Sequence, residues 1–238
     1  MKRPKEWMVL AAGFLCLVGV LCSLPKVDRA DAAYREANRP HILIDPGHGG
    51  ADGGATGADG TQEKDVNLSV SRTLSALFHI LGYDVTMTRE TDCSIHSPEV
   101  TSLREQKVSD MHNRLALYQQ ATLVVSIHQN QFSQSKYSGA QVFYAPGHPE
   151  SQEAAALIRE EILRLLQPEN TRELKRADKA LYLMANTTVP TVLVECGFLS
   201  NPEECRKLAD PEYQRQMAFA VAAGVMRCYD GGAPAPAE

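Results

Sequence analysis

Short apolar segments alternate with longer amphipathic segments along most of the chain. The apolar segments are rich in β-branched and aromatic residues, which favour strands. They are HILID (41–45), YDVTMTR (83–89), TLVVSIH (122–128), AQVFYA (140–145) and TVLVEC (191–196). Strands of this kind, separated by helices, are typical of a parallel sheet that is covered on both faces. The pattern therefore predicts an α/β fold with a largely parallel sheet and helices on both faces.

The segments between the predicted strands have the period of amphipathic helices. Residues 65–81 place Leu68, Leu74 and Phe78 on one helical face, and Gly82 ends the pattern. Further helices are predicted at 110–120, 149–166 and 211–229. With 238 residues, the chain is long enough for one such domain, which we place at residues 41–230.

The two ends of the chain have a different composition. Three basic residues within the first five positions precede an uncharged apolar run from Trp7 to Leu24. This length lies between a secretory signal and a minimal membrane span, so residues 1–32 are predicted to be a signal peptide or a membrane anchor. We favour an uncleaved anchor, because the small residues at 30–32 lie well past the run. Residues 33–40 are interpreted as a linker and 231–238 as a disordered tail.

Charge and cysteine content narrow the classes of function. The net charge is −5 and no basic stripe with interleaved aromatic residues is present, which argues against a nucleic-acid partner. Outside the apolar run the cysteines are Cys93, Cys196, Cys205 and Cys228, and no C-x-x-C pair occurs. A thiolate zinc site is therefore not expected, and the sequence leaves the disulfide state of these four cysteines open.

Four polar residues lie close to the ends of predicted strands or the start of a helix. His48 stands in a glycine-rich loop after the first strand, and Glu63 stands just before the helix at 65–81. His128 ends the third strand, and Glu195 lies near the end of the last one. In open α/β sheets, ligands bind outside the carboxyl ends of the strands. We therefore expect two imidazoles and two carboxylates to converge on one site.

This set of side chains points to metal chemistry. Two histidines and one carboxylate, with an open fourth position, are a usual ligand set for catalytic zinc. The remaining carboxylate would then act as a general base or stabiliser beside a water molecule. The spacing alone does not say which glutamate has which role, because no compact motif such as H-E-x-x-H is present. The glycines around His48 would let the loop approach a ligand closely.

Each of these residues also has a purely structural interpretation. A lone histidine at a strand end is more often a hydrogen-bonded structural residue, and a buried arginine such as Arg114 would neutralise Glu195. An unpaired Glu195 would be costly at the end of an apolar strand. The glycine loop lacks the full G-x-G-x-x-G pattern, and no G-K-[ST] follows, which argues against a phosphate site. The other histidines are interpreted as surface or packing residues: His41, His79, His96, His112 and His148.

Three stretches together resemble a known family. IDPGHGGADGGATGADGTQEKDVNLSV is similar to the opening motif of zinc-dependent N-acetylmuramoyl-L-alanine amidases of the amidase-3 type. VVSIHQN resembles the second histidine motif of that family, and VPTVLVECGFLSNPEE resembles its final acidic motif. The resemblance extends from about residue 41 to 229, and its three motifs occur in the family's order.

The resemblance implies a fold, an activity and a role for each candidate residue. It implies a six-stranded sheet flanked by helices, one zinc ion, and hydrolysis of the amide bond between the muramic acid lactyl group and L-alanine. By position, His48, Glu63 and His128 match the zinc ligands, and Glu195 matches the catalytic glutamate. Peptidoglycan would be the substrate and the membrane a partner through the N-terminal segment, so the domain would act outside the cytoplasm. An accessory activator protein is left open.

The chain also departs from the family in places. Gln129 and Gln131 flank Asn130, where the family usually has small residues, so they are expected to narrow or rewire the substrate groove. The interval between His128 and Glu195 has no obvious room for the self-blocking helix of some division amidases. A short anchored catalytic domain resembles the spore-cortex amidases, which help to form muramic-δ-lactam.

Two other classes of function stay open from the sequence. One is a zinc peptidase that uses the same site but cleaves within the stem peptide. The other is a catalytically silent module that binds the cell wall and keeps the fold. The presence of all four candidate residues argues against the silent module.

Overall fold

The computed structural model describes residues 40–230. The predicted signal or anchor at 1–32, nearly all of the predicted linker and the predicted tail lie outside these residues. In chain order the elements are β1 (His41–Pro46), α3 (Glu63–Ile80), β2 (Asp84–Met87), α4 (Leu103–Tyr118), β3 (Leu123–Asn130), β4 (Gln141–Tyr144), α5 (Pro149–Leu165), β5 (Lys175–Arg176), α6 (Tyr182–Asn186), β6 (Thr191–Phe198), α7 (Pro202–Ala209) and α8 (Pro211–Asp230). Among the described helices, none combines the length and apolar character needed to cross a membrane.

The strands form one mixed, six-stranded sheet in the order β2-β1-β3-β6-β4-β5. β1 pairs in parallel with β2 and β3, and β3 pairs in parallel with β6. β4 runs antiparallel to β6, and the two-residue β5 follows the direction of β4. No helix separates β3 from β4, so β4 returns in the opposite direction. The prediction of a mostly parallel sheet is confirmed, with this reversed edge added.

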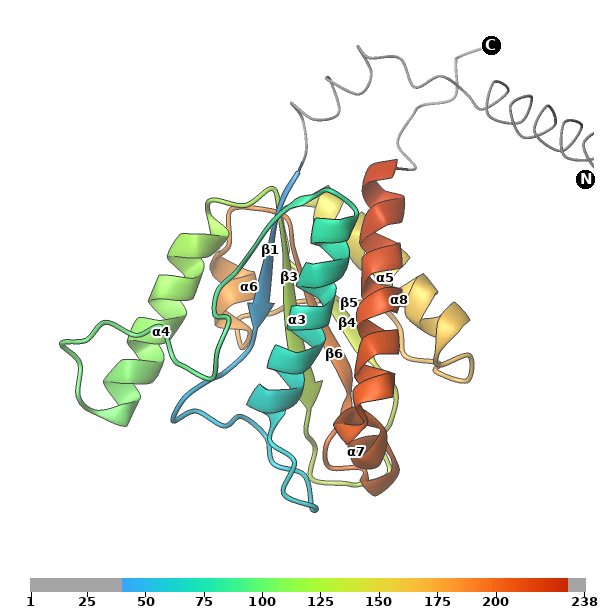
Figure 1. The fold of residues 1–238 in the computed structure, drawn as a ribbon, viewed down its shortest axis with the longest axis horizontal. Helices are drawn as coiled ribbons and strands as arrows, with labels where there is room; N and C mark the ends of the chain where they lie inside the picture. Colours follow the sequence, from blue (N-terminus) through green and yellow to red (C-terminus); the bar gives the residue numbers. More distant parts are fainter. Residues whose placement is uncertain (1–39, 231–238) are drawn as a thin grey trace, which may run out of the picture. The chain divides into compact units, whose positions relative to one another are not determined.

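Helices cover both faces of the sheet. Successive strand residues point to opposite faces, so apolar residues on both faces need helices to bury them. Ile42 and Ile44 of β1 share a large buried cluster with apolar residues of α3, α5 and α8. Leu43, between them, belongs to a smaller cluster with Tyr118 of α4. Figure 1 shows α3, α5 and α8 on one side of the sheet, with α4 and α6 on the other. This arrangement leaves the carboxyl ends of β1, β3 and β6 free to carry a site.

Several elements differ from the prediction. α4 begins at Leu103, seven residues before the predicted start, because the Ser102 side chain caps it by accepting from the backbone N–H of Glu105. The first turns of α4 are mostly exposed, so they carry no apolar stripe that would indicate a helix. α7 was not predicted; it starts where Asn201 accepts from two backbone N–H groups and Pro202 takes the first helical position. α6 and β5 are too short to give a periodic signal.

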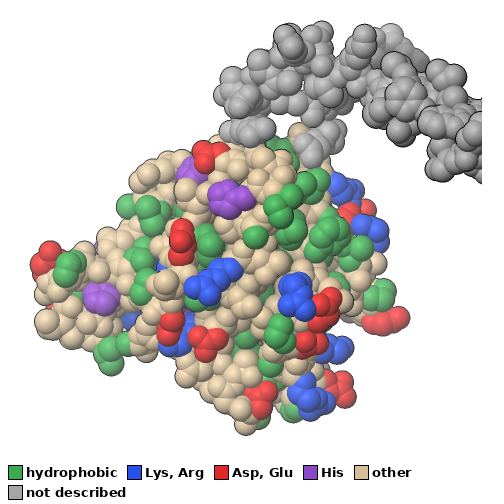
Figure 2. Space-filling view, viewed as in Figure 1, with side chains coloured by type: hydrophobic (Ala, Val, Ile, Leu, Met, Phe, Trp, Pro, Cys, Tyr) green, Lys and Arg blue, Asp and Glu red, His purple; other side chains and the backbone are tan. Residues whose placement is uncertain are grey.

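The surface carries both signs of charge. On the face shown in Figure 2, Asp and Glu side chains lie among Lys and Arg side chains over the described domain. Such mixing accords with the small net charge of −5. The four cysteines of the described residues, Cys93, Cys196, Cys205 and Cys228, are all free. No disulfide therefore contributes to the stability of residues 40–230.

Candidate metal centre and active site

The four candidate residues come together at one edge of the sheet. His48 follows β1, Glu63 is the first residue of α3, and His128 and Glu195 lie in β3 and β6. His128 and Glu195 are paired in register across the two neighbouring strands. A register shift between His128 and Asn130 marks a bulge at the end of β3. β-Bulges of this kind re-aim side chains next to functional sites.

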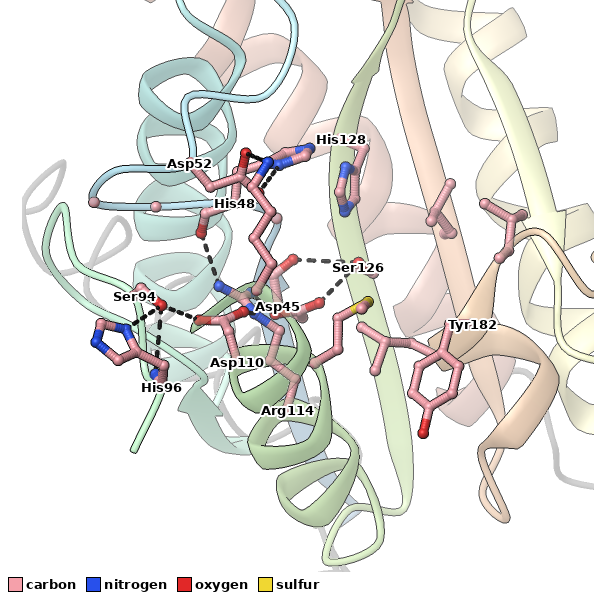
Figure 3. A pocket seen from close by; sticks show the side chains of 18 of the residues that line it. Asp45, His48, Asp52, Ser94, His96, Asp110, Arg114, Ser126, His128 and Tyr182 are labelled. Carbon is pink, nitrogen blue, oxygen red and sulfur yellow. Dashed lines mark hydrogen bonds and ion pairs between the residues drawn. The ribbon is translucent and has the colours of Figure 1, made fainter. Parts of the chain in front are cut away.

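Three of the residues form a compact cluster of potential metal ligands. One ligand atom from each of His48, Glu63 and His128 lies within 4.8 Å of the other two. His48 Nε2 is 3.2 Å from Glu63 Oε2, and His128 Nδ1 is 2.9 Å from Glu63 Oε1. The two imidazole rings meet edge to face, with centroids 5.0 Å apart. Figure 3 shows both rings on the side of the cavity away from Tyr182.

Glu63 is held as a charged carboxylate. Its side chain is buried, but Oε2 accepts from the backbone N–H of Ala55 at 2.8 Å and Oε1 accepts from that of Gln129 at 3.1 Å. Burial by itself would raise the pKa of Glu63, yet the hydrogen bonds and charges of His128 and His48 outweigh it and hold the pKa far below its usual range. A carboxylate that stays ionised is suited to bind a cation.

The surroundings of His48 favour its positively charged form. Burial would lower the pKa of His48, but hydrogen bonds to the carboxylates of Asp52 and Glu63 raise it to about 9. In the metal-free protein an imidazolium therefore lies between two carboxylates. A bound cation would take the place of that proton, because the imidazole must be neutral to donate its lone pair.

Glycines make this close approach possible. A Cβ atom on Gly47 would lie 2.1 Å from the His128 ring, and one on Gly54 would lie 2.5 Å from Glu63 Oε2. Gly54 also has a φ of 67°, which favours glycine. His48 has a φ of 61°, and it is the only non-glycine residue with a positive φ among residues 40–230. The glycine-rich loop therefore leaves room for the side chains of His128 and Glu63.

Two buried arginines fix the loop that carries His48. Arg114 Nη2 donates to the carbonyl of His48 at 2.7 Å, and Arg89 Nη2 donates to the carbonyl of Gly47 at 3.0 Å. Arg114 also pairs with the buried carboxylate of Asp45 and the partly buried carboxylate of Asp110. The proposal that Arg114 neutralises Glu195 is therefore wrong, because its guanidinium points to these acidic residues and to the loop.

Glu195 keeps a free carboxylate oxygen. Its Oε2 atom is shielded from solvent and has no hydrogen-bond partner among the described residues. Burial raises the pKa of Glu195 to about 7, with the positive charge of His128 opposing the rise and the charge of Glu63 adding to it. A carboxyl group with a pKa near 7 can take up and release a proton at physiological pH. Glu195 and Glu63 thus have opposite properties within one site.

A cavity of about 560 Å³ opens beside this cluster. Its wall includes His48, His128 and Glu195 at one end, and residues of α4 and of the segment 180–184 elsewhere. His96, expected to be an ordinary surface or packing residue, also lines the cavity and is hydrogen-bonded to Ser94 (Figure 3). The volume is in the range of ligand pockets that take small organic groups.

Gln129 does not line this cavity. Its side chain is buried and donates to Asn67 Oδ1 at 3.0 Å, while its backbone N–H bonds Glu63. The expectation that Gln129 narrows the groove is therefore wrong for its side chain, which lies toward α3. Gln131 is exposed at the end of β3 and does not line the cavity either.

Asp52 and Lys107 also belong to the site, although neither was predicted from the sequence. Asp52 Oδ2 accepts from His48 Nδ1 at 2.9 Å, and Asp52 Oδ1 pairs with Lys107 Nζ at 2.8 Å. The sequence does contain one signal for Asp52, since it stands four residues after His48 in the same glycine loop. Lys107 gives no such signal, because only the folded position of α4 brings it to the loop.

The donor set fits a zinc ion. Two imidazole nitrogens and a carboxylate that stays ionised are ligands that Zn²⁺ prefers, and a catalytic site keeps its fourth position open. Because Gly54 has no Cβ atom, Glu63 and His48 can lie close enough to each other to share an ion. Glu195, with its unpartnered oxygen, lies next to this cluster rather than in it.

Known proteins are similar to this chain in sequence and in fold. The family model for N-acetylmuramoyl-L-alanine amidases matches residues 42–227. A germination-specific N-acetylmuramoyl-L-alanine amidase of Bacillus subtilis is 39% identical over 96% of this chain and 97% of its own length. The CwlD amidase of Clostridioides difficile, solved in complex with the GerS lipoprotein, matches with a TM-score of 0.77 and 39% identity, over 81% of this chain and 99% of that one. The AmiC2 amidase of Nostoc punctiforme matches with a TM-score of 0.62 and 30% identity, over 79% and 96% of the two chains. The chain therefore belongs to the N-acetylmuramoyl-L-alanine amidase family.

Proposed function

We propose that this enzyme is a zinc-dependent amidase that hydrolyses the amide bond between the lactyl group of N-acetylmuramic acid and L-alanine in peptidoglycan. The observation that carries the proposal is the cluster of His48, Glu63 and His128 at the end of a cavity that Glu195 also lines. His48, Glu63 and His128 would hold the ion. Bound zinc supplies a Lewis acid that polarises a carbonyl and brings the pKa of water toward ~7.

Glu195 has the role of general base in this proposal. Its carboxylate would accept the proton of the attacking water and return it to the departing alanine nitrogen. Two observations support this role. The pKa of Glu195 is raised to about 7, and its Oε2 atom accepts no hydrogen bond from any described group. Glu63 is a poor base by comparison, since its hydrogen bonds hold its pKa low.

The biological setting follows from the relatives. We propose that the enzyme acts outside the cytoplasm on the spore cortex, because a germination-specific amidase is similar over nearly the whole chain. The cortex role would include the formation of muramic-δ-lactam. The N-terminal apolar run would export the domain and anchor it to a membrane. A lipoprotein is a candidate accessory partner, because the similar Clostridioides difficile amidase was solved with one.

Mass spectrometry of digested peptidoglycan tests the proposed reaction. Purified protein with zinc should release intact stem peptides that begin with L-alanine. Internal peptide fragments would instead indicate the zinc peptidase, and no products would indicate the silent wall-binding module. Glu195→Gln protein, loaded with zinc, is the matched control for hydrolysis by a contaminating enzyme.

A further inference from the structure

The two ring nitrogens of His48 have different surroundings. Nε2 faces the ligand cluster, 3.2 Å from Glu63 Oε2. Nδ1 lies on the other edge of the ring, 2.9 Å from Asp52 Oδ2. An ionised carboxylate can only accept a hydrogen bond, so Nδ1 carries a hydrogen in this arrangement. Once a cation takes the place of the proton on Nε2, the lone pair of Nε2 faces the ligand cluster.

The loop around His48 gives its ring few side chains to pack against. Its immediate neighbours are Gly47, Gly49 and Gly50. Backbone hydrogen bonds between Gly49 and Asp52, at 2.9 and 3.2 Å, close a tight turn that brings the Asp52 side chain to the ring. Packing by neighbouring loop side chains therefore cannot fix the orientation of the imidazole, whereas a hydrogen bond from a fixed carboxylate can.

Asp52 is itself held by a residue of α4 that also lines the cavity. Its second oxygen, Oδ1, is 2.8 Å from Lys107 Nζ of α4. Asp52 is therefore bound on one side by the imidazole and on the other by an ammonium group (Figure 3 shows the contact with His48). His48 and Asp52 are about one-quarter exposed, at 26% and 28% of their side-chain surfaces, whereas Lys107 is 58% exposed. The contact with Lys107 is accordingly the weaker of the two.

We propose that Asp52 is the positioning residue that orients His48 for metal binding, and that Lys107 holds Asp52 in place from α4. The inference rests on the metal site of the proposed function. Asp52 does not touch the metal position; it acts through the ring of His48. The backbone of His48 is fixed separately, because Arg114 donates to its carbonyl at 2.7 Å. Loss of Asp52 should therefore free the ring without releasing the loop.

Zinc affinity of the full chain measures this role directly, by competition with a chromophoric chelator. Asp52→Ala should weaken zinc binding by about 10- to 100-fold, the usual effect of removing a hydrogen-bond partner of a ligating histidine. Lys107→Met should weaken binding by about two- to fivefold, as expected for an exposed ion pair. Arg215→Met removes a comparable exposed pair, with Glu212 on α8, and should leave the affinity unchanged.

The sign of the Lys107 effect separates positioning from simple charge repulsion. If Lys107 only repelled the cation, Lys107→Met would bind zinc more tightly than wild type. Weaker zinc binding supports an indirect role of Lys107, through its contact with Asp52. Tighter zinc binding overturns the role assigned to Lys107.

Two double variants separate the hydrogen bond from the charge of Asp52. Asp52→Asn with Lys107→Met and Asp52→Ala with Lys107→Met carry the same net charge, and only the asparagine offers an oxygen to His48 Nδ1. The asparagine variant should bind zinc about two- to tenfold more tightly, the range of one hydrogen bond. Equal affinity in the two would overturn the inference.

Folding and metal binding are checked on the same samples. The thermal unfolding temperatures of the metal-free variants should stay close to that of wild type. If the single variant Asp52→Ala proves unfolded, the comparison of the two double variants tests the positioning role instead. Wild-type protein that binds no zinc would contradict the proposed function. Tight zinc binding by wild type and equally tight binding by folded Asp52→Ala would contradict only the positioning role.

Discussion

Replacing Glu195 with glutamine should change the pH dependence of the stability of the metal-free protein. Burial within β6 raises the pKa of Glu195 from its ordinary value of 4.5 to about 7. A carboxyl group with a raised pKa binds its proton more tightly in the folded than in the unfolded state. Its contribution is therefore complete below pH 4.5 and is lost as the pH rises through about 7, where the folded state must hold a buried charge.

The size of the effect follows from the pKa values. A rise from 4.5 to about 7 corresponds to roughly 3 kcal/mol of unfolding free energy, at about 1.4 kcal/mol per pKa unit. This figure is an upper value, because residue 195 is only partly buried as a whole although Oε2 is shielded. Glutamine resembles the protonated glutamic acid and carries no charge at any pH. Glu195→Gln should thus be nearly neutral at about pH 4 and stabilising, by up to about 3 kcal/mol, at about pH 8.5.

Urea unfolding of chelator-treated protein at these two pH values measures the difference. Other groups titrate over the same range, so the informative quantity is the wild-type value minus the Glu195→Gln value at each pH. Glu212→Gln, which removes an exposed carboxylate on α8, controls for a general loss of negative charge. A difference between wild type and Glu195→Gln that is the same at both pH values would refute the reasoning, since it would mean that Glu195 ionises normally in the folded protein.

Three further predictions concern the metal, the two glutamates and the location. His48→Ala and His128→Ala should each lose most bound zinc, and a chelator should abolish activity reversibly; full zinc content, measured by atomic absorption, would contradict the ligand assignment. Glu195→Gln should keep zinc while turnover falls by roughly 10²- to 10⁴-fold, whereas Glu63→Gln should lose zinc and partly recover in excess metal; the reverse result would exchange their roles. The full chain should fractionate with membranes, with its domain open to protease added outside; recovery in the cytoplasmic fraction would count against export.

The strand-end residues could be predicted because two simple regularities coincide in them. Apolar runs mark the central strands β1, β3 and β6, and parallel strands place their carboxyl ends at one edge. His48, His128 and Glu195 follow or end those runs, so their convergence needed no knowledge of distant contacts. The direction of β4 was outside this reasoning, because an edge strand is short and its orientation depends on how the chain returns after β3.

Contacts between side chains on different elements could not be predicted in the same way. Arg114 was a reasonable partner for Glu195 by charge alone, but the position of α4 directs it to Asp45, Asp110 and the carbonyl of His48. Lys107 lies in the exposed first half of the same helix. That half has no apolar periodicity from which a helix could be predicted. The S-x-x-E pattern at Ser102 does predict the start of α4, and with that start Lys107 falls within the helix rather than before it.

The two glutamates differ in environment, although they are the same residue type at the edge of one sheet. Glu63 begins a helix, and the backbone N–H groups of Ala55 and Gln129 and two imidazoles face its oxygens, so its charged form is stabilised. Glu195 lies within the apolar strand β6, where its Oε2 meets no described donor, so its neutral form is stabilised. Environments that push the pKa values of neighbouring carboxylates apart separate their chemical roles. In the proposed roles a ligand must remain ionised and a base must exchange a proton near neutral pH. The hydrogen-bond donors around Glu63 favour the first, and the burial of Glu195 Oε2 without a described donor favours the second.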